Sequence, residues 1–122
     1  MLENKLYIIK EFNFEKEELK AQIEINPQSE IFKGHFPDVP VLPGVSMMHL
    51  VKELLEKALN RSLNVVSAKN IKFLQMVNPT ITNTLDVLVN ILDNQQDELS
   101  IKASLQSQDN THFKMTAQLK IT

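Results

Sequence analysis

The sequence predicts an α+β fold in which an antiparallel β-sheet wraps around one central α-helix. Three segments in the C-terminal half alternate apolar and polar residues with a period of two, so each should form a strand with one apolar face. One segment in the middle, from Val45 to Leu59, contains no Gly or Pro and is apolar around most of a helical circumference. Such a sheet and helix bury their apolar surfaces best when the sheet curls around the helix. With 122 residues the chain has room for one hydrophobic core, and we expect residues 1–122 to form a single domain.

The N-terminal quarter predicts a β-hairpin. Leu6 to Phe14 is rich in Tyr, Ile and Phe, and Leu19 to Ile25 alternates apolar and polar residues. The acidic link from Glu15 to Glu18 should form the turn, and Asn26-Pro27-Gln28-Ser29 should end the second strand.

The central helix, Val45 to Leu59, is expected to lie inside the protein. Its polar residues His49, Lys52, Glu53 and Glu56 should form a narrow solvent face, and Glu53 and Lys57 stand at helical i,i+4 spacing. Four further strands should follow, at Val65 to Val77, Leu85 to Ile91, Leu99 to Leu105 and Phe113 to Ile121. Polar clusters at 93–97 and 107–111 predict the turns between the last three.

Composition excludes several classes of protein. Thirteen basic and fifteen acidic residues give a net charge of -2, which argues against nucleic acid as a partner. No apolar run is long enough to predict insertion into a membrane, and the first residues lack the layout of a secretion signal. The absence of cysteine excludes disulfides and a thiolate nucleophile. We therefore expect a cytoplasmic protein.

One stretch, Gly34 to His49, concentrates the residues that shape loops and carry chemistry. It holds both glycines, three of the five prolines and two of the three histidines. Glycine permits backbone conformations closed to other residues, and proline fixes φ. This stretch is where we expect the functional site.

The same stretch resembles a known family. The run from Phe32 to Pro37 (FKGHFP), then Pro40, then Leu42-Pro43-Gly44-Val45, resembles the signature of the (3R)-hydroxyacyl-acyl-carrier-protein dehydratases of bacterial fatty-acid synthesis. Lys69 to Pro79 is similar to the strand that follows the helix in that family. The resemblance implies the hotdog fold, in which an antiparallel sheet wraps around a long helix.

The resemblance also implies an activity and partners. The enzyme would be a hydro-lyase that removes water from a 3-hydroxyacyl thioester to give the trans-2-enoyl thioester, in fatty-acid-like or specialised lipid and polyene synthesis. The substrate would be carried on the phosphopantetheine of an acyl carrier protein, with no other cofactor. The protein would act as a homodimer or as a heterodimer with another hotdog subunit.

The sequence departs from the family at two positions. Where the housekeeping enzymes usually have a catalytic carboxylate, five residues after Gly44, this chain has His49. At this position the chain resembles a specialised branch of the family, which includes the aryl-polyene dehydratases and accepts histidine there. Asp38 also replaces a glycine that is common after His-Phe-Pro.

The chemistry assigns roles within this frame. The neutral imidazole of His35 suits abstraction of the C2 proton near pH 7. The N–H of Gly44, at the start of the helix, would stabilise the enolate oxygen. His49 would assist the departing C3 hydroxyl. Phe36 and Val45 are expected to contact the substrate.

For several other residues the sequence supports less specific predictions. Met47, Met48, Phe73 and Met76 are candidates for lining an acyl tunnel, although such residues more often form plain core. His112 is expected to be structural or exposed, and Lys33, Lys69 and Lys72 are candidates for meeting an acidic carrier protein. Three histidines without ligand spacing predict no metal site.

Two alternatives stay open. One is a hotdog acyl thioesterase, in which Glu53 would activate a water, although the His-Phe-Pro frame argues against it. The other is a non-catalytic or half-active subunit that binds carrier protein and completes a heterodimeric dehydratase. The histidine at position 49 is its main support.

Overall fold

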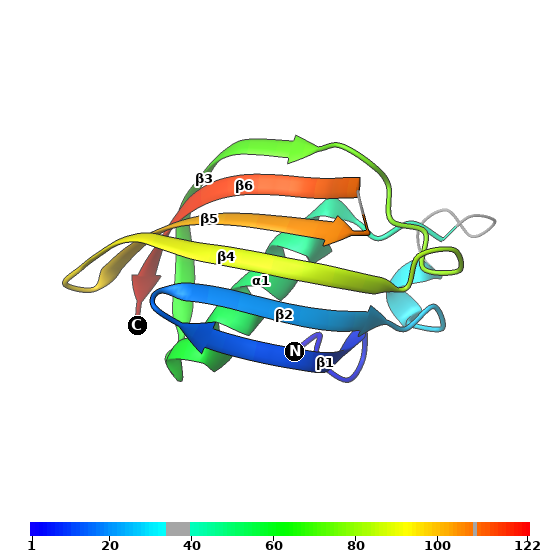
Figure 1. Ribbon diagram of the computed structural model, residues 1–122, viewed down its shortest axis with the longest axis horizontal. Helices are drawn as coiled ribbons and strands as arrows, with labels where there is room; N and C mark the ends of the chain where they lie inside the picture. Colours follow the sequence, from blue (N-terminus) through cyan, green and yellow to red (C-terminus); the bar gives the residue numbers. More distant parts are fainter. Residues whose placement is uncertain (34–39, 109) are drawn as a thin grey trace.

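The computed structural model describes residues 1–33, 40–108 and 110–122. The described chain forms one six-stranded antiparallel sheet in the order β1-β2-β4-β5-β6-β3, with β1 and β3 at the two edges (Figure 1). The elements are β1 (Tyr7–Glu15), β2 (Glu18–Ile25), the short 3₁₀ helix η1 (Glu30–Phe32), α1 (Gly44–Leu59), β3 (Leu63–Phe73), β4 (Thr84–Gln95), β5 (Glu98–Ser107) and β6 (Asn110–Ile121).

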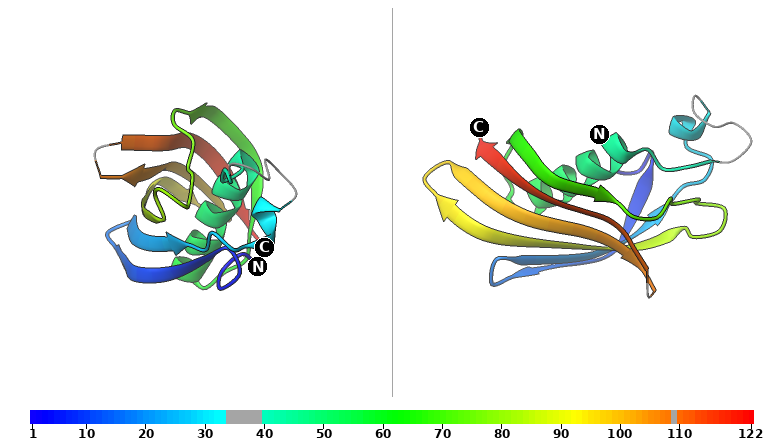
Figure 2. Two further views of the ribbon diagram at one scale, coloured as in Figure 1. Left: turned by 90° about the vertical axis from the view of Figure 1, so that its right-hand side faces the viewer. Right: turned by 90° about the horizontal axis from the view of Figure 1, so that it is seen from above.

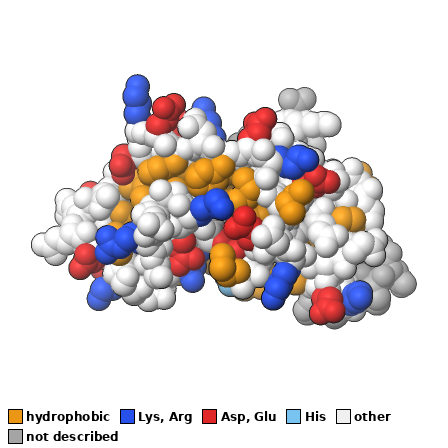
Figure 3. Space-filling view, turned by 90° about the horizontal axis from the view of Figure 1, so that it is seen from below, with side chains coloured by type: hydrophobic (Ala, Val, Ile, Leu, Met, Phe, Trp, Pro, Cys, Tyr) orange, Lys and Arg blue, Asp and Glu red, His pale blue; other side chains and the backbone are white. Residues whose placement is uncertain are grey.

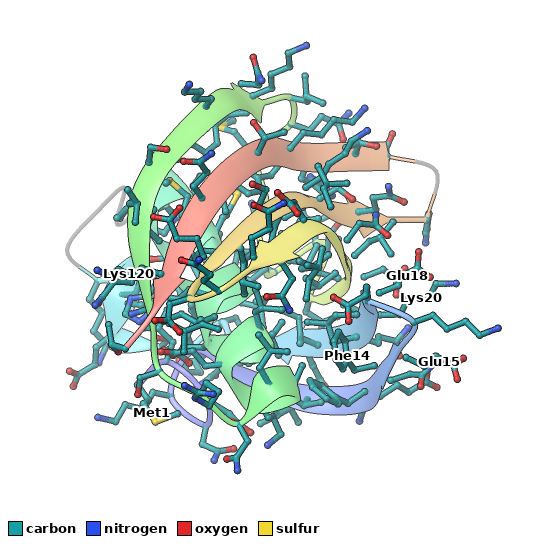
Figure 4. The ribbon with its side chains drawn as sticks, turned by 90° about the vertical axis from the view of Figure 1, so that its left-hand side faces the viewer. Met1, Phe14, Glu15, Glu18, Lys20 and Lys120 are labelled. Atoms are coloured by element: carbon teal, nitrogen blue, oxygen red, sulfur yellow. The ribbon has the colours of Figure 1, made fainter. Side chains whose placement is uncertain are left out.

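The sheet curves around α1, and this arrangement confirms the predicted α+β hotdog fold. Figure 2 shows α1 on the concave side of the sheet, and Figure 4 shows the strands arching over the helix from β3 to β1. One long helix thus serves as the centre of the core, and the outer face of the sheet is left to solvent.

The strict alternation of β4, β5 and β6 explains why the sheet has one apolar face. Their inward residues are buried against α1, whereas the residues between them point outward. These inward residues are Leu85, Val87, Val89, Ile91, Leu99, Ile101, Ala103, Leu105, Phe113, Met115, Ala117 and Leu119. The α1 side chains in the same core include Leu50, Val51, Leu54 and Leu55, each with 0% exposure. The predicted strand patterns are confirmed.

The first hairpin forms at the predicted link. Lys16 and Glu17, the two residues between β1 and β2, have φ angles of 52° and 63°. Two consecutive positive φ angles are the mark of a type I′ turn, whose twist matches that of the flanking strands. Phe14, Glu15, Glu18 and Lys20, labelled in Figure 4, mark this end of the hairpin.

The prediction for the third strand is wrong at its end. The expected strand reached Val77, but β3 ends at Phe73. Beyond this point the N–H groups of Leu74 and Gln75 both donate to the carbonyl of His112, at 2.9 and 3.4 Å. The two donors share one acceptor instead of continuing the ladder, so the chain leaves the sheet. The prediction also missed η1.

Helix α1 begins one residue before its predicted start and ends where predicted. Asn60 ends it in the left-handed conformation with φ of 54°, and its N–H donates to the carbonyl of Glu56. None of the helical segments in residues 1–33, 40–108 and 110–122 has both the length and the apolarity needed to cross a bilayer.

Candidate functional site

At the N-terminus of α1, the N–H of Gly44 has no hydrogen-bond acceptor among the described residues. Pro43 occupies the N-cap position and supplies no side-chain acceptor, while its carbonyl accepts the N–H groups of Ser46 and Met47 at 3.0 and 3.1 Å. Helix geometry leaves the N–H groups of Gly44 and Val45 without an acceptor inside the helix. Donors at a helix N-terminus favour negative charge. The helix therefore begins at Gly44, and the binding of an oxyanion by its N–H stays a prediction.

Phe73, at the end of β3, lies against Gly44. A Cβ atom added to Gly44 would stand 2.6 Å from the Cε1 and Cζ atoms of the Phe73 ring, closer than real contacts allow. The ring also packs on Phe113 of β6, with centroids 5.4 Å apart. Glycine at position 44 thus makes room for an aromatic ring of the chain itself. Because Phe73 is 57% exposed, this ring forms part of the surface beside the helix N-terminus.

His49 lies one turn and a half into α1, five residues or about 7.5 Å along the axis from Gly44. Its side chain is 50% exposed, and its Nε2 stands 3.1 Å from Oε2 of Glu53. Val45, at the start of the same helix, is 74% exposed. An imidazole that is half accessible and held by a carboxylate can exchange protons with a ligand at this surface.

Glu53 does not belong to a solvent face, and that expectation is wrong. Its side chain is only 4% exposed. Oε2 accepts the N–H of Leu2 at 2.7 Å, and Oε1 accepts the N–H of Glu3 at 3.1 Å and the hydroxyl of Tyr7 at 3.0 Å. The residues before β1, together with Tyr7 at its start, therefore cover this side of α1. Met1, labelled in Figure 4, lies in this region, beside a groove that Glu53 also lines.

The Tyr7 hydroxyl is a permanent donor to this carboxylate. Burial first, and then the nearby charge of Glu53, raise the pKa of Tyr7 far above its ordinary value. The hydroxyl thus keeps its proton over the whole physiological range. With these donors and His49 around it, Glu53 has no free lone pair with which to activate a water, which removes the main support for the thioesterase alternative.

Lys57 also differs from its expected role. Its spacing suggested a pair with Glu53, but its Nζ lies 3.6 Å from Oε2 of Glu3. This contact adds a second link between α1 and the segment that precedes β1.

The four predicted tunnel residues do not share one environment. Met47 is buried in the core with 3% exposure, and Met48 packs partly against it. Phe73 covers Gly44, and Met76 is 74% exposed. Because one of the four is in the core and another is largely exposed, a tunnel lined by all four stays a prediction.

His35 and Phe36 fall within residues 34–39, outside the residues that the structure describes. Their predicted roles remain predictions from the sequence. Within the described ranges, no three His, Asp or Glu side chains gather as metal ligands.

His112 is structural, one of the two roles expected for it. Its Nδ1 lies 3.2 Å from the carbonyl oxygen of Gln75, so Nδ1 carries the proton and Nε2 accepts the hydroxyl of Ser107 at 2.5 Å. A serine beside an imidazole is also the arrangement of a nucleophile. Ser107 and His112 are, however, only 6% and 4% exposed. We interpret them as a clamp that holds the segment after β3 against the β5–β6 hairpin.

The family model and the curated relatives agree on one family. Residues 11–120 match the family ApeI-like, described as ApeI dehydratase. The chain is 27% identical over 106 residues to the 3-hydroxyacyl-[acyl-carrier-protein] dehydratase FabZ of Chlamydia caviae, covering 80% of this chain and 69% of that protein. It is 30% identical over 100 residues to FabZ of Rickettsia typhi, covering 73% and 67%.

A solved structure agrees with these relatives. The dehydratase heterocomplex ApeI:P from Xenorhabdus doucetiae contains a chain that superposes with a TM-score of 0.76 and 26% identity, over 93% of this chain and 97% of that one. The likeness thus covers nearly the whole chain and is not confined to the site.

Proposed function

Because the chain belongs to the ApeI-like dehydratase family and is therefore a hydro-lyase, we propose that it removes water from a 3-hydroxyacyl thioester carried on an acyl carrier protein. The observation that supports this most directly is the pairing of two features on one helix. The N-terminus at Gly44, where Pro43 supplies no side-chain cap, and the half-exposed His49 lie within one and a half turns of each other.

The proposed reaction divides its work among three groups. His35 takes the C2 proton, and the N–H of Gly44 stabilises the negative charge that develops on the thioester oxygen. His49 donates a proton to the C3 hydroxyl as the C3–O bond breaks, so water leaves and the trans-2-enoyl thioester remains. The purified protein should therefore hydrate an enoyl thioester in the reverse direction. Hydrolysis of the thioester without hydration would contradict the proposal.

A lysine patch on the outer face supports an acidic carrier protein as partner. The patch consists of Lys69 and Lys72 on β3, Lys114 on β6 and Lys102 on β5, all exposed. Lys72 and Lys114 are direct cross-strand partners, and Thr116 pairs with both Lys69 and Lys102. Like charges directly opposite each other destabilise a sheet, so the Lys72–Lys114 pair does not help to stabilise this one. Among the described residues no ion pair neutralises the patch.

Reversing the charge of this patch should weaken use of the carrier-linked substrate. We expect Lys72→Glu/Lys114→Glu to lower kcat/KM for an acyl-carrier-protein substrate about tenfold at low salt, with a smaller effect at high salt. Turnover of the same acyl group on a truncated pantetheine should not change. The control Lys16→Glu/Lys20→Glu makes the same change of net charge on the β1–β2 hairpin. An equal loss in the control, or on the truncated substrate, would contradict a docking role for the patch.

The edge strand β3 supports a dimer. Its exposed apolar residues include Val65, Val66, Ile71 and Phe73, with exposures between 37% and 57%. An open edge with apolar side chains invites pairing with another strand. The other edge, β1, exposes Ile8 and Phe12, and hydrophobic side chains form a band among charged ones on the face seen from that side (Figure 3). Of these two edge strands, β3 passes the N-terminus of α1, where Phe73 contacts Gly44.

We propose that a second hotdog subunit covers β3 and that His35 of each subunit faces His49 of the other. The partner would be a second copy of this chain or, as in the heterocomplex from Xenorhabdus doucetiae, a different subunit. A non-catalytic or half-active role in a heterodimer therefore remains the second candidate function.

Sedimentation should distinguish these possibilities. We expect a homodimer at micromolar concentration and a monomer for Val66→Lys, because a lysine on β3 would be buried at the interface without a partner charge. The control Ile8→Lys, on β1, should stay dimeric. A wild-type monomer that hydrates enoyl thioesters only after a second hotdog subunit is added would instead favour the heterodimer.

A further inference from the structure

The unusual feature of the site is a carboxylate that supports the histidine from one helical turn away. Glu53 follows His49 by four residues, and its Oε2 is 3.1 Å from the histidine Nε2. A carboxylate accepts hydrogen bonds and donates none, so Nε2 must carry a proton in this contact. The other ring nitrogen, Nδ1, is then the atom through which His49 can serve a substrate.

The carboxylate itself is held in place by contacts from outside the helix. The N–H groups of Leu2 and Glu3 and the hydroxyl of Tyr7 donate to it at 2.7 to 3.1 Å. A buried carboxylate is tolerated only when it is hydrogen-bonded in this way. Glu53 is consequently a fixed acceptor, whereas His49, at 50% exposure, would otherwise be free to rotate.

We infer that Glu53 is a positioning residue for His49, which orients the imidazole and fixes its tautomer. This inference rests on the proposed role of His49 in the dehydration. A protonated His49 carries N–H groups on both nitrogens, with the Nε2 proton bonded to Glu53. When Nδ1 gives its proton to the departing hydroxyl, the neutral ring that remains is the Nε2–H tautomer. Glu53 already binds that tautomer, so the ring need not rotate during the step.

The test compares two substitutions on the same helix. Glu53→Gln removes the negative charge at nearly constant size, and its amide can either donate or accept toward His49. We expect kcat for enoyl-thioester hydration to fall about tenfold or more, with KM within about twofold of wild type. The control Glu56→Gln makes the same chemical change at a carboxylate that accepts the N–H of Leu63 at 2.9 Å and is not paired with His49. Glu56→Gln should leave kcat within about twofold of wild type.

Nuclear magnetic resonance gives a second measurement on the wild-type protein. Long-range ¹H–¹⁵N correlations should show neutral His49 as the Nε2–H tautomer, and Glu53→Gln should shift the population toward Nδ1–H. This measurement decides the inference even where Glu53→Gln folds poorly, because a wild-type Nδ1–H tautomer would overturn it.

The kinetic outcomes separate the inference from the function on which it rests. If His49→Ala is impaired but Glu53→Gln retains the wild-type kcat, Glu53 only anchors the N-terminal residues and the inference is wrong. If His49→Ala itself retains the wild-type rate, the proposed role of His49 fails first.

Discussion

His35→Ala is expected to abolish dehydration and leave the fold intact. His35 is the proposed base, and a positioned base contributes about 10²–10⁴-fold to the rate. Hydration of an enoyl thioester, followed by the loss of its conjugated absorbance, measures the effect. The circular dichroism spectrum and the unfolding temperature should stay near those of wild type.

A second measurement, the exchange of the C2 proton in heavy water, distinguishes the role of His35 from that of His49. His35→Ala should stop exchange at C2 of the bound thioester, whereas His49→Ala should retain part of it, because His49 is assigned to the C3 hydroxyl and not to C2. Undiminished hydration by His35→Ala would remove this residue from the mechanism. Equal exchange in the two variants would contradict the division of roles.

His49→Ala is expected to lower kcat about 10²-fold or more, with little change in KM. The sequence alone suggests that His49→Glu should retain activity, since it restores the carboxylate usual in the family. The structure changes this expectation. A glutamate at position 49 would face the buried carboxylate of Glu53, which would also lose one of its hydrogen-bond donors. We expect His49→Glu to be poorly active and less stable by about 1–3 kcal/mol.

The double variant His49→Glu/Glu53→Gln tests this reasoning. The amide of Gln can donate to the new carboxylate, so the double variant should be more stable and more active than His49→Glu. Thermal unfolding and hydration of an enoyl thioester, measured on all three proteins, check the order. A His49→Glu protein that is as active as wild type would show that Glu53 does not constrain the residue at position 49.

The sequence by itself determined the fold and the position of the helix N-terminus. The alternation of β4, β5 and β6 and the apolar segment after Pro43 are local patterns that depend only on which face of each element is buried. The proline at 43 and the glycine at 44 likewise predicted where α1 begins. Local patterns could not predict where β3 ends. The end depends on the hydrogen bonds of Leu74 and Gln75 to the carbonyl of His112, nearly forty residues further along the chain.

The tertiary structure alone decided what surrounds His49. By helical periodicity Glu53 belonged with the solvent-facing residues, and no local signal distinguishes it from Glu56. Its burial comes from Leu2, Glu3 and Tyr7, which lie 46 to 51 residues away in sequence. Phe73 reaches Gly44 only because β3 passes the start of α1. A helical pattern specifies which side of a helix is apolar, but contacts from distant segments decide which polar side chains on the other side become part of a site.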